Sequence, residues 1–157
     1  MNKIQLHQQL MVHLQLLLDN TKTAAKRAHE TATSEENVAE NKYDTLALEA
    51  AYLAQGQSQR VNQCQTDIDI CINLPTGNSS AGSIGALVVL IDEFEQAKYL
   101  LICPVAGGIT LQWDQHTVQV VTPQSPIGAA LLNQKKDEAI TVNIAGKKQH
   151  YEIIQVI

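Results

Sequence analysis

The sequence predicts an α+β protein, with an N-terminal antiparallel α-helical coiled-coil hairpin followed by a small antiparallel β-sheet domain with one short helix. Residues 1–74 hold one glycine, Gly56, and no proline, whereas residues 75–157 hold the other seven glycines and all four prolines. Apolar residues recur at helical spacing before Pro75 and in strand-length runs after it. We therefore expect a hairpin over residues 1–74, a linker over 75–83 and a globular domain over 84–157.

Two series of apolar and small residues follow alternating steps of three and four, which is typical of the inner face of a coiled coil. The first series is Leu10, Leu14, Leu17, Thr21, Ala24, Ala28 and Thr31, and the second is Tyr43, Ala47, Ala50, Ala54, Gln57, Val61, Cys64, Ile68 and Cys71. Folding the chain back on itself pairs Leu10 with Cys64, so the turn is predicted near Asn37 and the tip over residues 34–41. Each arm of about thirty residues would extend roughly 45 Å.

The predicted tip is acidic, because the stretch SEENVAENKYD at residues 34–44 contains four carboxylates. Two explanations stay open. The acids fit capping boxes at the start of a helix, where carboxylates stabilise the first turn. Alternatively, they serve a function at the end of the hairpin, since Glu35 and Glu36 would lie near the C-terminus of the first helix, where the dipole opposes them.

The C-terminal part reads as a sheet with one helix. Apolar, β-branched-rich runs over residues 84–92 and 98–104 predict two strands, and residues 107–113 and 117–122 predict two more. The run SPIGAALLN predicts a short helix, with Ser125 as N-cap, Pro126 at the first helical position and Asn133 as a left-handed C-terminal cap. Residues 139–144 and 149–156 then form a closing hairpin around Ala145-Gly146.

Composition excludes several classes of function. A net charge of −5 and a pI near 5.4 argue against a general duplex-DNA binder. We expect a cytoplasmic protein without membrane contact, because no signal peptide or transmembrane run is evident. The three cysteines lack CxxC spacing and the five histidines are dispersed, so we expect no stably bound metal and no cofactor. The sequence leaves the oligomeric state open, with a monomer as the expected form.

The order of a helical prong, a linker and a small sheet domain resembles the GreA/GreB family of transcript-cleavage factors. The family's C-terminal domain carries a run similar to S-P-[IL]-x-x-A-L-[LI]-G-K, followed by an acidic residue before a strand. The matching residues are Ser125, Pro126, Ile127, Ala130, Leu131, Leu132, Lys135 and Asp137. The resemblance implies an FKBP-like fold for the globular domain and, as partner, the core RNA polymerase of bacteria.

The resemblance also implies roles for particular residues. The globular domain would dock on the rim of the polymerase secondary channel through Ser125, Pro126 and Ile127, while the prong enters the channel. Tip carboxylates, here Glu36, Glu40 and Asp44, would help hold a transient Mg²⁺ shared with the polymerase beside a backtracked transcript. The basic residues Lys26, Arg27 and Lys42 would contact nucleic acid in the complex, although they also fit a solvated face in which intrahelical ion pairs reach Glu30.

The tip departs from the family pattern, which reads roughly D-x-x-E-N-x-E-Y. Aligning its Glu-Asn step on Glu40 and Asn41 puts the amide Asn37 at the family's aspartate position. Aligning without a gap on Tyr43 instead puts Glu36 at the aspartate position and Ala39 at the glutamate position, so either alignment loses one of the two acids. Cleavage stimulation and simple occupation of the channel therefore both stay open, and the chain itself is not expected to be an enzyme. Two other functions are a prolyl isomerase, which needs an aromatic-lined proline pocket, and a coiled-coil scaffold that dimerises through its arms.

Overall fold

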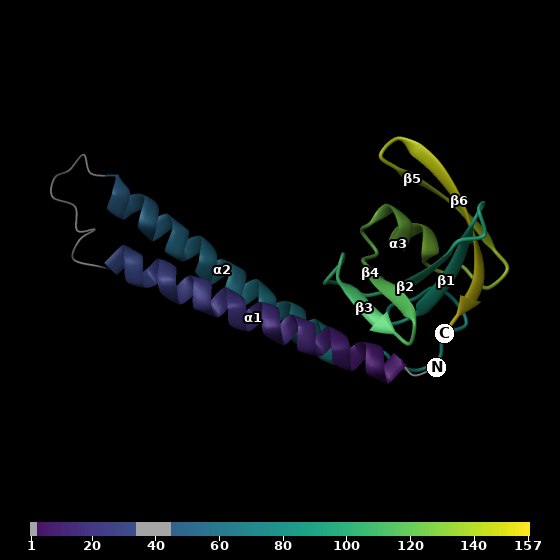
Figure 1. Ribbon diagram of the computed structural model, residues 1–157, viewed down its shortest axis with the longest axis horizontal. Helices are drawn as coiled ribbons and strands as arrows, with labels where there is room; N and C mark the ends of the chain where they lie inside the picture. The colour runs from purple at the N-terminus through teal and green to yellow at the C-terminus, as the bar shows by residue number, and fades with distance from the viewer. Residues whose placement is uncertain (1–2, 34–44) are drawn as a thin grey trace. The chain divides into compact units, whose positions relative to one another are not determined.

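The computed structural model describes residues 3–33 and 45–157 (Figure 1). The chain forms two compact units, one made of His13–Asp69 and the other of Met1–Val12 together with Ile70–Ile157. The beginning of the first long helix and the end of the second therefore pack in the same unit as the sheet. None of the helices in the described part of the chain combines the length and the apolar character that crossing a membrane requires.

The two predicted long helices are present as α1, Lys3–Thr33, and α2, Leu46–Ile72. In α2 the predicted inner face is confirmed over the described residues, because every member of the series from Ala47 to Cys71 is buried or half-buried. In α1 the prediction holds up to Thr21 and again at the buried Ala28, but it fails at Ala24 and Thr31, which are exposed. The half-buried residues there are Ala25 and Ala32, one position farther along, which follows the helical repeat of about 3.6 residues more closely than the assumed heptad.

The predicted register between the helices is wrong. We expected Leu10 opposite Cys64, but in the structure the Thr21 hydroxyl oxygen lies 3.8 Å from the Cys64 sulfur. Eleven residues separate Leu10 from Thr21, which corresponds to roughly 16 Å along a helix at about 1.5 Å per residue. Similar small residues recur along both helices, so sliding one helix past the other by whole turns gives an equivalent pattern of contacts. The spacing of these residues therefore does not determine which of them pair. The predicted turn at Asn37 lies outside the described residues.

The C-terminal part forms a six-stranded sheet with the order β3-β4-β2-β1-β6-β5. The elements are β1 Leu87–Asp92, β2 Ala97–Ile102, β3 Thr110–Trp113, β4 His116–Val121, α3 Pro126–Leu131, β5 Ala139–Ile144 and β6 Lys147–Val156. Neighbouring strands are antiparallel except β2 and β4, which pair in parallel. The sheet is thus mixed and differs from the expected antiparallel sheet at this one pair, because β3 and β4 form their own hairpin and only β4 reaches β2.

Both faces of the sheet are buried. On one face α3 covers a core that includes Leu90, Ile102, Leu131 and Ile153. The other face buries Leu87, Leu101 and Val118. At the edge of the sheet, the Gln9 side chain of α1 accepts a hydrogen bond from Gln112 N–H on β3 at 3.0 Å. Cys71 on α2 and Cys103 after β2 are fully buried, with their sulfur atoms 3.5 Å apart.

Lys3 is a buried lysine at the start of α1. Its ammonium nitrogen donates hydrogen bonds to the carbonyl oxygens of Gly85 at 3.0 Å and Ile157 at 2.9 Å. Burial lowers the pKa of this side chain, because desolvation disfavours its charged form. The residue therefore ties the first turn of α1 to two segments that flank β1 and β6, at an electrostatic cost.

The segment 75–83, expected to be a flexible linker, is held at Gly82. Gly82 N–H donates to the Gln134 carbonyl at 2.7 Å, and its own carbonyl accepts from Asn133 N–H at 2.7 Å. A Cβ atom at this position would lie 1.9 Å from the Leu131 carbonyl oxygen, so only glycine permits the approach. This end of the segment is therefore part of the globular unit.

Candidate functional site

The segment before α3 is built around the hydroxyl of Ser125, and the predicted N-cap is confirmed. The backbone of Ser125 is extended, with φ −74° and ψ 150°, and its hydroxyl accepts a hydrogen bond from Gly128 N–H at 3.1 Å. The same hydroxyl donates to the Thr122 carbonyl at 2.7 Å. Pro126 begins the helix, where its fixed φ suits the first turn. The cap therefore fixes both the loop before the helix and the helix itself.

Gly128 is a residue that sequence reasoning missed. A Cβ atom there would lie 2.0 Å from the Thr122 carbonyl oxygen, so the helix approaches the preceding loop at a distance that no other residue allows. The signal available in the sequence was a glycine inside a six-residue helix, a position where glycine is otherwise unfavourable. The glycine therefore indicated that another group lies close to the helix here, but the sequence did not show that this group is the Thr122 carbonyl.

The three predicted docking residues have different environments. Pro126 is exposed, whereas Ser125 and Ile127 are half-buried. Ile127 packs against the core beneath α3, and the Ser125 hydroxyl is engaged by Thr122 and Gly128. Pro126 is therefore the residue of this group that offers the most free surface, while its two neighbours hold it in place.

The helix ends as the sequence predicts. Asn133 adopts a left-handed conformation with φ 64°, two residues after the last helical residue, Leu131. Its N–H bonds to Gly82, so the capping turn also secures the segment that leads into the domain. The surface around Pro126 is consequently rigid on both sides.

The second predicted site lies at the tip of the hairpin. Its acids Glu36, Glu40 and Asp44, and the basic residue Lys42, lie outside the described residues. Lys26 and Arg27 are exposed on α1, and Lys26 forms an ion pair with Glu30 at 3.8 Å. This pair joins side chains four residues apart that are 79% and 61% exposed, so it contributes little to stability.

Arg27 also borders a hollow of about 330 Å³ between the helices. The hollow is lined by Ala24, Arg27, Ala28, Thr31, Ala50, Leu53 and Gln57. Small side chains on both helices leave this space, and the guanidinium group is the only charged group among its lining residues. The exposed Arg27 guanidinium therefore places a positive charge beside this hollow.

Within residues 3–33 and 45–157, no group of three or more His, Cys, Asp or Glu side chains is arranged to hold a metal ion. The residues expected to meet Mg²⁺, Glu36, Glu40 and Asp44, lie outside the described residues.

The aromatic residues of the sheet domain are divided among three places, and no more than two of Phe, Tyr and Trp share one of them. Tyr99 stacks on His116 with ring centroids 4.3 Å apart, and Trp113 is buried beside them. Phe94 is 75% exposed in the β1–β2 turn, while Tyr151 is buried in the core that α3 covers. This dispersal gives no support to the proline pocket that an isomerase needs.

Comparison with known proteins addresses the sheet domain and the chain as a whole. Residues 83–157 match the family model described as "Transcription elongation factor, GreA/GreB, C-term". The protein "Transcription elongation factor GreA" of Syntrophobacter fumaroxidans (strain DSM 10017 / MPOB) is 25% identical over 152 residues, which cover 95% of this chain and 92% of that protein.

Solved structures are similar over most of the chain. Gfh1, GreA factor homolog 1, of Thermus thermophilus covers 94% of each chain at 16% identity, with a TM-score of 0.41. Gfh1 of Thermus aquaticus covers 92% of this chain and 91% of its own, at 16% identity and a TM-score of 0.42. The family match spans all six strands together with the capped segment Ser125–Asn133. Over residues 83–157 the chain is therefore similar to the C-terminal domain of the GreA/GreB transcription elongation factors.

Proposed function

We propose that this chain is a transcription elongation regulator that binds core RNA polymerase at the secondary channel. The observation that carries the proposal is the family match over residues 83–157, which includes the whole sheet domain and the segment around Pro126. In this role the globular domain docks on the channel rim and the tip of the hairpin reaches the active centre. The chain has no catalytic activity of its own.

The geometry around α3 supports docking through a pre-formed surface. Ser125, Gly128 and Asn133 each fix the backbone on either side of the exposed Pro126. A surface that is already ordered loses little conformational entropy when a partner binds. The same segment would be a poor catalytic site, because the Ser125 hydroxyl is committed to its cap.

Two modes of action differ only in the tip. In one, tip carboxylates supply oxygen ligands to a second Mg²⁺ of the polymerase and stimulate transcript cleavage. In the other, the hairpin occupies the channel without supplying them. Because Asn37 stands where the family pattern has an aspartate, we favour occupation without cleavage.

The proposal is tested by measuring the affinity of the full chain for bacterial core RNA polymerase. Pro126→Asp places a charge on the docking surface, and aspartate suits the first turn of a helix, so the domain should still fold. We expect this change to weaken binding by about tenfold or more, on the scale of a central interface residue. Asn143→Asp adds the same charge at an exposed residue beside the β5–β6 turn and should bind as the unchanged chain does. A full chain that folds but shows no binding would refute the proposal.

A further inference from the structure

Strand β6 is longer than the strand beside it. The pairing of β6 with β1 begins only at Tyr151, which lies opposite Asp92, whereas its pairing with β5 begins four residues earlier, at Lys147. The four residues from Lys147 to His150 therefore have a neighbouring strand on one side only. On the other side, beyond the end of β1, this arm of the β5–β6 hairpin borders a hollow of about 440 Å³.

The backbone of this arm can accept another strand. Ile153 N–H donates to the Glu138 carbonyl and its own carbonyl accepts from Asp137 N–H, so odd-numbered residues of β6 direct their backbone groups towards the β5 side. Because the direction alternates along a strand, Lys148 and His150 direct theirs towards the hollow. Such an edge is a template for an added strand.

The opposite wall of the hollow is the β1–β2 turn, which presents Phe94. The Asp92 carboxylate accepts hydrogen bonds from the backbone N–H groups of Phe94 and Gln96, each at 2.9 Å, and thereby fixes the turn. Phe94 is 75% exposed, which leaves its ring available for an apolar contact. A held turn with an outward aromatic residue suits an anchor for a partner side chain.

The hollow also gathers cations in a chain whose net charge is −5. Lys98, Lys147 and Lys148 all line it. Lys98 donates to the Tyr151 hydroxyl at 2.8 Å and lies 4.8 Å from the centre of that ring. Among the described residues, no ion pair joins any of these lysines to a carboxylate.

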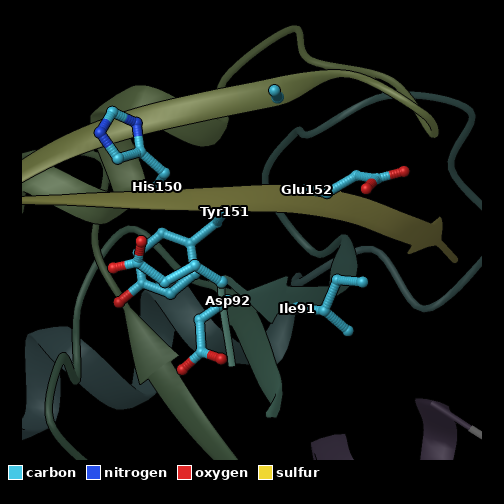
Figure 2. Close-up of a pocket in the computed structure, with 7 residues that line it drawn as sticks. Ile91, Asp92, His150, Tyr151 and Glu152 are labelled. Carbon is cyan, nitrogen blue, oxygen red and sulfur yellow. The ribbon is translucent and has the colours of Figure 1, made fainter. Parts of the chain in front are cut away.

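The side chains of the arm alternate between its two faces. Figure 2 shows His150 and Tyr151 leaving β6 on opposite sides, with Asp92 on the Tyr151 side. His150 is engaged across the hairpin, where its Nδ1 lies 2.9 Å from the Thr141 hydroxyl. The hollow therefore receives backbone groups from His150 and positive charge from the lysines.

We propose that this hollow is a docking site for an extended, acidic segment of a partner protein. The segment adds as a strand along Lys147–His150, places an apolar side chain against Phe94, and directs carboxylates to Lys147 and Lys148. A nucleic-acid strand fits less well, because its uniform negative charge would meet Asp92 and Glu93 on the other wall. A peptide can place its charges at one end only.

The site is tested with the full chain and a phage library that displays random twelve-residue peptides. We expect enriched peptides to combine Asp or Glu with a large apolar residue. Synthetic copies should lose about tenfold or more in affinity for the double variant Lys147→Glu, Lys148→Glu. Lys148→Pro removes a backbone donor that faces the hollow and should weaken binding without reversing a charge.

The matched control is Lys135→Glu with Lys136→Glu, two adjacent exposed lysines on the turn before β5, which should bind the peptides unchanged. Failure of the library to enrich any peptide, or equal binding by the Lys147 and Lys148 variants, would overturn the proposal. So would tighter binding of a single-stranded RNA oligonucleotide that depends on the same lysines. Self-association lost in the same variants would assign the surface to a second copy of this chain instead.

Discussion

At the scale of single residues, glycine and lysine positions set the strictest demands on this fold. Gly128 is the clearest case, because its missing side chain lets α3 lie against the Thr122 carbonyl. Gly128→Ala should destabilise the folded state by about 1–3 kcal/mol, since the helix has to move away and the Ser125 cap is strained. Gly77→Ala is the control, because a Cβ atom there meets nothing within 4 Å. Thermal or denaturant unfolding measures both, and equal stabilities would contradict the close-packing account.

Lys3 gives a prediction about pH. Its folded pKa lies below the ordinary value of 10.5, so between the two values the unfolded state binds more protons than the folded state. The stability linked to this group is fully present above pH 10.5 and is lost as the pH falls through the folded pKa. The free energy of unfolding of the unchanged chain should therefore rise relative to that of Lys3→Met as the pH approaches 10.5.

The measurement is urea unfolding of both proteins across the alkaline range. Lys135→Met, which deletes an exposed lysine, shows how far a lysine's removal alone changes the curve. A constant difference between Lys3→Met and the unchanged chain would mean that Lys3 has the same pKa in both states. Lys3→Met is also expected to be less stable at every pH, because the carbonyls of Gly85 and Ile157 lose their buried donor.

At the scale of elements, local patterns predicted more than pairings did. The helices, the strands and the Ser125 cap follow from residue spacing and turn chemistry within a few positions of each other. The register of Thr21 against Cys64 and the parallel pairing of β2 with β4 depend on residues far apart in the chain, so spacing does not determine them. The same limit explains why the sequence indicated Pro126 but not the hollow beside β6. That hollow exists because β6 continues past the end of β1.

At the scale of the whole molecule, the globular domain and the tip of the hairpin are expected to divide the work. In the proposed function, the domain provides affinity for the polymerase, whereas residues 34–44 decide what happens in the channel. This division concerns binding and activity. It has to be tested by function, with binding and cleavage measured on the same preparation.

The tip prediction concerns Glu40, which matches the acid of the family's Glu-Asn step. Glu40→Ala should change the free energy of unfolding by about 1 kcal/mol or less, the scale of a capping contribution. If the chain stimulates cleavage in backtracked complexes, the same change should lower that activity by about tenfold or more, because a well-placed charge near a reacting group is lost. Glu36→Ala should lower cleavage in the same way only if Glu36 takes the role of the family's aspartate.

A chain that binds polymerase and never stimulates cleavage would act by occupying the channel. Asn37→Asp would then be the change that restores a charged oxygen ligand. Cleavage gained by Asn37→Asp at unchanged affinity would identify the amide as the cause, because an amide oxygen carries no net charge to hold the second ion.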